Sequence, residues 1–366
     1  MNIAFYAPLK SPNHPVPSGD RLMARMLMRA LERKGHSVEV ASELRSYSRV
    51  PDTDVWTDLI ANAGLEVSRI SERWRDEPTP DVWFCYHPYY KAPDLIGPRL
   101  AERFGLAYVT AESSYAAKRD DGPWMKWQGS VRNGLERAVV NFCLTERDRP
   151  GILAAVPTAR TASLKPFIDT ALFAEKGSRR DEPGLCLMSV AMMREGDKFE
   201  SYRFLAGALK KLPESLPWTL SVIGDGPKAA EVKQLFADIP AGRVEWLGSK
   251  PETEVAELLA KGSIYVWPGN GEAYGLAYLE AQAAGLPVIA QRIAGVPEVV
   301  ADGVSGTLTP PGDGDAYAGA IADLLNDDAR RMALAAKARN FVLEQRSLDQ
   351  AAATIDAILR ETTGLK

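Results

Sequence analysis

The chain has 366 residues, of which 46% are hydrophobic and 25% are charged, and its formal net charge is −4. This length exceeds the usual size of one hydrophobic core, so two domains are expected. A charge this close to neutral argues against a nucleic-acid partner. The apolar runs are too short to span a bilayer, and the N-terminal residues are typical of a buried strand rather than a signal peptide.

The three cysteines, Cys85, Cys143 and Cys186, are widely spaced and form no CxxC pair, and the chain has only three histidines. This pattern predicts neither a disulfide framework nor a zinc site. It is typical of a reduced cytoplasmic protein. We therefore expect a cytoplasmic chain that needs neither a metal nor a resident cofactor.

The first half alternates short apolar segments with segments of helical periodicity. Residues 20–34 have apolar side chains at helical spacing, and Gly35 follows as a helix end. Residues 45–80 are polar with scattered Trp and are expected to form helix and loop. Strands are expected at residues 3–7, 38–41, 82–86, 107–110 and 142–145. Strands that alternate with helices predict a parallel sheet covered on both faces.

The pattern breaks after residues 165–173, and the polar stretch 177–184 (GSRRDEPG) is typical of a linker. A second alternating series then begins and closes with helices expected at residues 328–345 and 348–362. Its strands are expected at residues 185–191, 220–223, 244–247, 264–267 and 287–290. The fold class predicted is α/β, with two doubly wound Rossmann-like domains facing each other across a cleft.

Residues 269–290 (GNGEAYGLAYLEAQAAGLPVIA) carry the most informative pattern. A strand ends in a Pro/Gly loop, and a helix is expected to begin near Gly275. The backbone N–H groups of Tyr274, Gly275 and Leu276 would then lie at a helix N-terminus, which favours binding of a phosphate. Glu272 precedes this helix and Glu280 lies on its second turn. A carboxylate beside a phosphate site is better explained as an acceptor for sugar hydroxyls than as a phosphate contact. Taken alone, the two residues fit equally well a surface-loop Glu and a Glu that favours an early helical turn.

The segment from Glu272 to Glu280 resembles the E-x7-E motif of the retaining nucleotide-sugar glycosyltransferases of family 4, also called glycosyltransferase group 1. The stretches LSVIGDGP (220–227) and AGVPEVVADGVSGTLTPPGD (294–313) are similar to other segments of that family. The resemblance implies a GT-B fold. Its expected parts are an acceptor-side domain over residues 1–170, a nucleotide-sugar-binding domain over 171–345, and a C-terminal helix over 346–366 that crosses back.

The resemblance also implies roles for residues of the second half. Glu280 would bind the ribose hydroxyls and Glu272 the transferred sugar. Lys198 stands where the family has a diphosphate-binding Lys, whereas Met192 stands at the usual Arg position, so Arg194 is the nearest replacement. The stretch that contains Leu247 resembles the segment beside the nucleobase, and Tyr274, Gly275 and Leu276 would complete the phosphate site.

The first half departs further from the family pattern. The family commonly has a sugar-contacting His after the strand at residues 107–110, where this chain has Glu112. An ionised Glu112 accepts but cannot donate a hydrogen bond, and it disfavours a uronate donor. His87 matches another His-bearing strand end and is assigned to the acceptor side. Gly19, in the loop before a helix, would let the backbone approach the diphosphate.

The resemblance implies a retaining, metal-independent transfer of a sugar from a nucleotide-diphosphate sugar to a hydroxyl acceptor, in cell-surface glycan or glycolipid assembly. The alternatives are a sugar-nucleotide epimerase or phosphorylase of the same architecture, and an inactive sugar-nucleotide-binding scaffold. Trp124 and Trp127 stand among Lys and Arg residues in segment 118–132. This composition fits ordinary packed Trp or a peripheral contact with the inner face of the cytoplasmic membrane.

Overall fold

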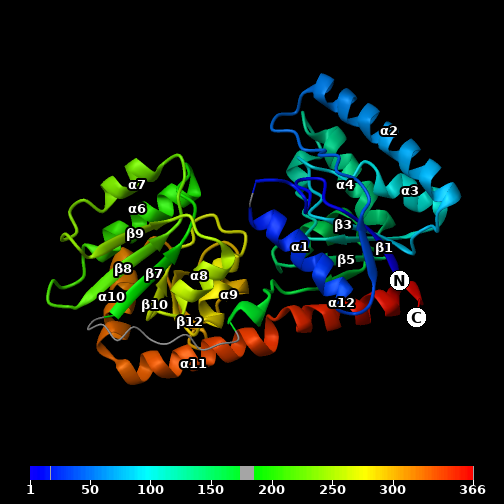
Figure 1. The fold of residues 1–366 in the computed structure, drawn as a ribbon. Helices are drawn as coiled ribbons and strands as arrows, with labels where there is room; N and C mark the ends of the chain where they lie inside the picture. The colour runs from blue at the N-terminus through cyan, green and yellow to red at the C-terminus, as the bar shows by residue number, and fades with distance from the viewer. Residues whose placement is uncertain (17, 174–184, 366) are drawn as a thin grey trace. The chain divides into compact units, whose positions relative to one another are not determined.

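The computed structural model describes residues 1–16, 18–173 and 185–365, so the expected linker at 177–184 lies outside the described residues. Residue contacts divide the chain into two compact units. Unit 1 comprises Met1–Lys165 and Leu348–Lys366, and unit 2 comprises Pro166–Ser347. Each unit contains a six-stranded parallel sheet with helices on its faces (Figure 1). This is the α/β, doubly wound architecture predicted from the alternating pattern.

The sheet of unit 1 has the strand order β2-β1-β3-β4-β5-β6. Its strands are β1 (Asn2–Tyr6), β2 (Ser37–Val40), β3 (Val82–Tyr86), β4 (Ala107–Ala111), β5 (Val140–Cys143) and β6 (Thr161–Ser163). The helices of the unit are α1 (Gly19–Glu32), α2 (Thr53–Asp76), α3 (Gly97–Phe104), η1 (Ala117–Arg119), α4 (Met125–Arg137), α5 (Arg149–Ala155) and α12 (Leu348–Thr363). Every residue of β3 is buried, as expected for a central parallel strand covered on both faces.

The sheet of unit 2 has the strand order β12-β11-β10-β7-β8-β9. Its strands are β7 (Leu185–Val190), β8 (Trp218–Ile223), β9 (Val244–Gly248), β10 (Ile264–Val266), β11 (Val288–Gln291) and β12 (Gly306–Thr309). Its helices are η2 (Thr170–Phe173), α6 (Asp197–Leu209), α7 (Ala229–Leu235), α8 (Glu252–Leu259), α9 (Leu276–Ala283), η3 (Val296–Glu298), α10 (Gly314–Asn326) and α11 (Asp328–Gln345).

The C-terminal helix α12 packs on α1 within unit 1 (Figure 1). It buries Ala352, Ile355 and Leu359 on one face. Two polar contacts join its first half to the residues that follow α1: Arg33 Nε lies 2.8 Å from Asp349 Oδ1, and His36 Nε2 lies 3.0 Å from Asp356 Oδ1. The apolar stripe therefore supplies the driving force for docking, and the two polar contacts add little to it because the Arg33–Asp349 pair is exposed and burial lowers the pKa of His36, which favours its neutral form.

Three expectations about elements need correction. The strand expected at 142–145 is Val140–Cys143, because the ladders to β4 and β6 pair Val140 through Cys143. Strands β6 and β12 were not expected, since their sequences TAS and GTLT are short and weakly apolar. Gly19 is the first residue of α1 rather than a loop residue, because Ser18 Oγ accepts a hydrogen bond from Arg21 N and caps the helix there.

A buried carboxylate joins β3, α3 and β4. Asp94 is 4% exposed, and its Oδ2 accepts hydrogen bonds from Trp83 Nε1 (2.9 Å) and Tyr108 Oη (3.1 Å). Its Oδ1 accepts from the backbone N–H groups of Ile96 (2.9 Å) and Gly97 (2.7 Å) at the start of α3. Four donors therefore offset the cost of burying this group and fix the helix against the sheet.

Asp94→Ala should destabilise unit 1 by about 3 kcal/mol, because it leaves buried donors on Trp83 and Tyr108 without an acceptor. Urea unfolding followed by tryptophan fluorescence measures the change. The matched control is Asp121→Ala at an exposed position, expected to lie within about 0.5 kcal/mol of wild type. Equal unfolding midpoints for the two variants would contradict the role given to Asp94.

Candidate functional site in unit 2

The strand order of unit 2 reverses between β7 and β10. The chain leaves β7 toward β8 and β9 on one side, and returns through β10 toward β11 and β12 on the other. Ligands of doubly wound sheets bind outside the carboxyl ends of the strands at such a switch point. The segments that follow β7 and β10, residues 191–198 and 267–275, are therefore the expected binding loops.

Glu272 is the centre of the polar contacts in these loops. Its Oε1 accepts a hydrogen bond from Trp267 Nε1 at 2.9 Å and forms an ion pair with Lys198 Nζ. Lys198 Nζ also lies 5.4 Å from the centroid of the Trp267 ring, a cation–π distance. The side chains of Glu272 and Lys198 are 12% and 20% exposed. The structure thus brings together two predicted site residues and adds Trp267, which was not predicted.

The loop that carries Glu272 is held against α6 and η3 by backbone contacts. Asn270 N donates to Ser201 Oγ at 3.0 Å, and Gly295 N donates to the Glu272 carbonyl at 3.0 Å. A Cβ on Gly271, whose φ is +62°, would lie 2.1 Å from Asp197 Oδ2, so only glycine permits this approach. The loop is therefore preorganised beside the start of α6, where Lys198 lies.

Helix α9 begins directly after this loop. Its N-cap is Gly275, at φ 84° and ψ 90°, and no side chain caps the helix. Tyr274 precedes it as a buried residue, and Leu276 is its first helical residue. The first N–H groups of an α-helix have no intrahelical acceptor and carry the positive end of the macrodipole. The start of α9 therefore has the chemistry to bind a phosphate next to Lys198 and Glu272.

Glu280 lies on α9 with a partly exposed side chain. Burial raises the pKa of its carboxyl to about 7, and the nearby charge of Glu252 adds to the rise. Such a carboxyl is half ionised near neutral pH. A ligand that donates hydrogen bonds to it would favour the ionised form.

Two further predicted residues lie on the same edge of unit 2. Arg194 is exposed in the loop before α6, as is Met192 at 48%. Leu247 is partly buried on the edge strand β9. Lys198 and Trp267 contact the Glu272 carboxylate, and Arg194 is not among its described contacts. The role of Arg194 as a phosphate contact stays a prediction.

Polar groups at the strand ends of unit 1

The strand order of unit 1 reverses between β1 and β3. The loop after β1 leads into α1, and the first two residues of α1 are Gly19 and Asp20. His87 directly follows β3. His87 Nδ1 lies 3.0 Å from Asp20 Oδ1. Asp20 was not predicted as a site residue, although a carboxylate that follows Gly19 in the first helical turn could have been noted. A Cβ on Gly19 would meet no atom within 4 Å, so the protein itself does not require glycine there.

Glu112 follows β4, the neighbour of β3. It is 8% exposed, and its Oε2 accepts a hydrogen bond from Tyr86 Oη at 3.0 Å. His87 and Glu112 have φ values of +57° and +58°, a left-handed conformation that is uncommon for residues other than glycine. Neighbouring strands thus end in two residues held in a costly backbone conformation, as occurs often at functional sites.

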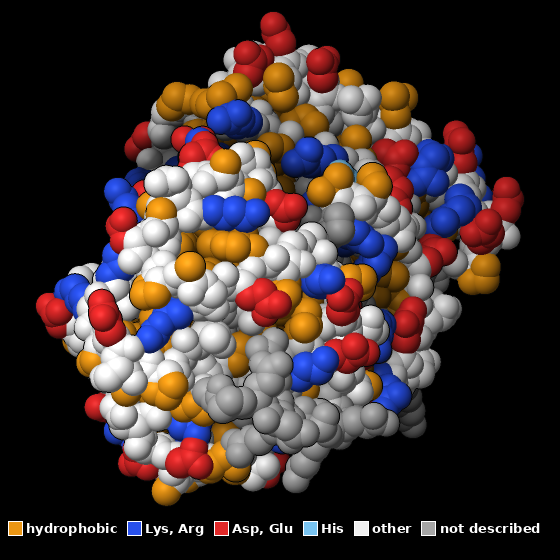
Figure 2. All heavy atoms as spheres, turned by 60° about the vertical axis from the view of Figure 1, so that its left-hand side comes forward, with side chains coloured by type: hydrophobic (Ala, Val, Ile, Leu, Met, Phe, Trp, Pro, Cys, Tyr) orange, Lys and Arg blue, Asp and Glu red, His pale blue; other side chains and the backbone are white. Residues whose placement is uncertain are grey.

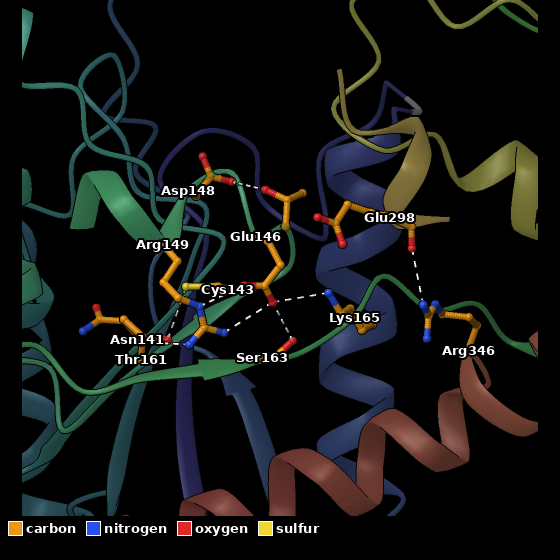
Figure 3. A network of polar contacts seen from close by, with 11 residues as sticks. Asn141, Cys143, Glu146, Asp148, Arg149, Thr161, Ser163, Lys165, Glu298 and Arg346 are labelled. Atoms are coloured by element: carbon orange, nitrogen blue, oxygen red, sulfur yellow. Dashed lines mark hydrogen bonds and ion pairs between the residues drawn. The ribbon is translucent and has the colours of Figure 1, made fainter. Parts of the chain in front are cut away.

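The end of β5 carries a further polar network, which the sequence analysis did not identify (Figure 3). Glu146 accepts from Arg149 Nε at 3.0 Å and contacts Lys165 Nζ at 3.3 Å. Thr145 Oγ1 donates to Asp148 Oδ2 at 2.6 Å. In unit 2, Arg346 Nη2 donates to the Glu298 carbonyl at 3.4 Å. The Glu146 contacts fasten Lys165, the last residue before the chain enters unit 2.

Trp124 and Trp127 are packed aromatic residues. Trp127 is 2% exposed, and its ring centroid lies 5.3 Å from that of Trp124 and 4.6 Å from that of Trp56. Packing therefore accounts for Trp127. On the face drawn in Figure 2, basic and acidic side chains are interspersed among the described residues. Within the described ranges, no helix has the length and apolar character needed to cross a membrane.

Titratable side chains in the described part of the chain form no group of three or more His, Cys, Asp or Glu suited to hold a metal ion. The three cysteines are buried and free. The polar features at the strand ends include the Glu272–Lys198–Trp267 cluster of unit 2, and the Asp20–His87 and Tyr86–Glu112 pairs and the Glu146 network of unit 1.

Solved structures show the same fold. A sucrose-phosphate synthase from Thermosynechococcus elongatus superposes with a TM-score of 0.75 over 100% of this chain and 99% of that chain, at 18% identity. HepE of Anabaena, solved in complex with UDP, gives a TM-score of 0.73 over 99% of this chain and 100% of that chain, at 15% identity. The fold class is therefore the GT-B type, built from two Rossmann-like domains.

Sequence comparisons identify relatives over most of the chain. The GDP-mannose-dependent alpha-(1-6)-phosphatidylinositol monomannoside mannosyltransferase of Mycolicibacterium smegmatis is 31% identical over 315 residues, which cover 79% of this chain and 78% of the relative. The phosphatidyl-myo-inositol mannosyltransferase of the same organism is 25% identical over 89% of this chain and 86% of its own length. Residues 186–327 match the family described as glycosyl transferases group 1. The chain is an enzyme that belongs to the glycosyl transferases of group 1.

Proposed function

We propose that this glycosyltransferase is retaining and metal-independent, and that it transfers a neutral sugar from a nucleotide-diphosphate sugar to a hydroxyl acceptor. The observation that carries the proposal is the cluster of Lys198, Trp267 and Glu272 beside the uncapped start of α9. One cation and a helix N-terminus supply the positive charge that a leaving diphosphate needs. The relatives that act on phosphatidylinositol compounds support a role in glycolipid assembly.

In this proposal Lys198 exchanges partners when the donor binds. Without donor, Glu272 neutralises the ammonium group in a largely buried position. The diphosphate would take over Lys198, and Glu272 would then accept hydrogen bonds from hydroxyls of the transferred sugar, while still receiving the Trp267 indole N–H. After the exchange the ammonium group is paired with the diphosphate, and the Glu272 carboxylate is hydrogen-bonded to neutral hydroxyls and to the Trp267 indole N–H. Neither charged group is left without a polar partner, which matters because an unpaired buried charge costs several kcal/mol.

Glu280 would bind the ribose of the donor. Its carboxylate can accept hydrogen bonds from two vicinal hydroxyls, and these favour the ionised form over the neutral one. Lys198 and the α9 N-terminus would hold the departing diphosphate. The configuration is retained if this diphosphate guides the acceptor hydroxyl to the same face of the sugar's anomeric carbon from which the diphosphate departs. Arg194 and the backbone of Gly19 are further proposed contacts of the diphosphate, and Leu247 of the nucleobase.

The function is tested by incubating the protein with a panel of nucleotide-diphosphate sugars and hydroxyl acceptors, with and without exhaustive chelation by EDTA. We expect release of nucleoside diphosphate and glycosylated product at a rate that EDTA leaves essentially unchanged, since Lys198 and the helix N-terminus carry the phosphate charge.

Loss of activity in EDTA with recovery on adding Mg²⁺ or Mn²⁺ would contradict metal independence. Interconversion of the donor sugar without transfer would indicate the epimerase alternative. Donor binding without any turnover would indicate the inactive scaffold.

Glu280→Gln should weaken binding of a nucleoside diphosphate by about 2 kcal/mol, roughly 30-fold, at pH 8, because an amide replaces a charged acceptor. For the wild type, affinity should rise about tenfold between pH 6 and pH 8. The sign follows from the raised pKa of about 7: the carboxyl is mostly protonated at pH 6 and mostly ionised at pH 8, and the ionised form binds. Titration calorimetry measures both effects.

The ligand's own phosphate titrates in the same range, so the pH dependence of Glu280→Gln serves as the reference. The matched surface control is Glu257→Gln on α8, an exposed position. If Glu280→Gln and Glu257→Gln bind the nucleotide equally well, Glu280 is not the ribose ligand.

A further inference from the structure

The contact between Asp20 and His87 joins the two segments that flank the switch point of unit 1. Asp20 lies in the first turn of α1, after β1, and His87 follows β3, the strand that pairs with β1. Asp20 Oδ1 lies 3.0 Å from His87 Nδ1. The side chains of Asp20 and His87 are 37% and 22% exposed. The pair is thus partly open to a ligand at the edge where doubly wound sheets bind one.

The imidazole is held from several sides. Its ring stacks on Tyr89 at 5.1 Å between centroids, and the Tyr86 ring lies at 5.7 Å. The backbone of His87 is fixed by a hydrogen bond from its N–H to the Ala111 carbonyl of β4 at 2.8 Å. A non-glycine residue at φ +57° costs about 1–3 kcal/mol. The contacts of the His87 ring and backbone therefore stabilise a backbone conformation that is unfavourable by itself.

We infer that Asp20 is a positioning residue that holds the Nδ1–H of His87, so that Nε2 accepts a hydrogen bond from the acceptor hydroxyl and orients it for transfer. This inference rests on the proposed function, in which His87 lies on the acceptor side. It extends that function by giving Asp20 the role of holding His87 in one tautomer. The tautomer of a histidine is set by the hydrogen bond that its other ring nitrogen makes, and a carboxylate at Nδ1 selects Nδ1–H.

The charges that face His87 come from three elements. Desolvation lowers the pKa of the imidazole, but Glu112 after β4, Asp20 on α1 and Asp148 after β5 together raise it above 6.5. Lys10, in the loop after β1, interacts with Asp20. Neutral His87 is the form whose Nε2 accepts a hydrogen bond. The kcat/KM for the acceptor should therefore rise as the pH increases through the pKa of His87.

The first test is a ¹⁵N-detected NMR titration of the histidine rings. The chain has three histidines, so the His87 signals can be assigned by their loss in His87→Gln. In the wild type, neutral His87 should be the Nδ1–H tautomer. Asp20→Asn should lower its titration midpoint by about one pH unit and mix the tautomers. Glu112→Gln should lower the midpoint while leaving the tautomer as Nδ1–H.

The matched control is Asp356→Asn, which removes the carboxylate 3.0 Å from His36 Nε2. It should change the His36 signals and leave those of His87 unchanged. Asp20→Asn signals that match the wild type in both midpoint and tautomer would overturn the inference.

The second test is kinetic. Asp20→Asn should reduce kcat/KM for the acceptor about tenfold at its plateau and move the acidic limb of the pH profile down with the NMR midpoint. The Kd for nucleoside diphosphate should be unchanged. An altered tautomer with unaltered acceptor kinetics would overturn the acceptor role. A wild type that turns over no donor would defeat the proposed function instead, and the NMR titration would still report on the Asp20–His87 pair.

Discussion

The pairing of Lys198 with Glu272 is the interaction on which the donor site of unit 2 depends. One carboxylate oxygen receives both the ammonium group and the indole N–H of Trp267, and both charged side chains are largely removed from water. Each charge stabilises the other, and removing either would leave a buried charge uncompensated. The loop can bring Glu272 to Lys198 because Gly271 and Gly295 have no side chain. A Cβ on Gly271 would clash with Asp197 of α6, and one on Gly295 would clash with the loop backbone.

In both sheets the polar residues of the candidate sites follow the strands at which the strand order reverses. In each, the connections leave neighbouring strands in opposite directions at the carboxyl edge, which is where doubly wound sheets bind their ligands. In unit 2 this edge carries a cation, a carboxylate and a helix N-terminus, which suits a sugar attached to a diphosphate. In unit 1 it carries Asp20, His87 and Glu112, a set that suits hydroxyl groups better than phosphates because two of the three are carboxylates.

The alternation of apolar strands and amphipathic helices predicted the fold class, because it is repeated often enough to outweigh local errors. It failed for β6 and β12, which are held by pairing with β5 and β11 rather than by their own apolar content. At the candidate site, Glu272 and Lys198 were predictable from their sequence context. Trp267 and Asp20 were not predicted. Trp267 follows an apolar strand and is 2% exposed, like an ordinary core residue, and the partner of Asp20 lies 67 positions away in the sequence. Trp127 is a packed residue, although the sequence also allowed it to face a lipid surface.

Calorimetric titration of a nucleoside diphosphate into the wild type and Glu272→Gln tests the partner exchange of Lys198 most directly. If Glu272 holds Lys198 until the diphosphate takes it over, removing the carboxylate charge frees the ammonium group and removes a repulsion from the phosphates. The variant should then bind the diphosphate about tenfold more tightly than the wild type, a gain of about 1.4 kcal/mol. Equal or weaker binding by Glu272→Gln would contradict the account.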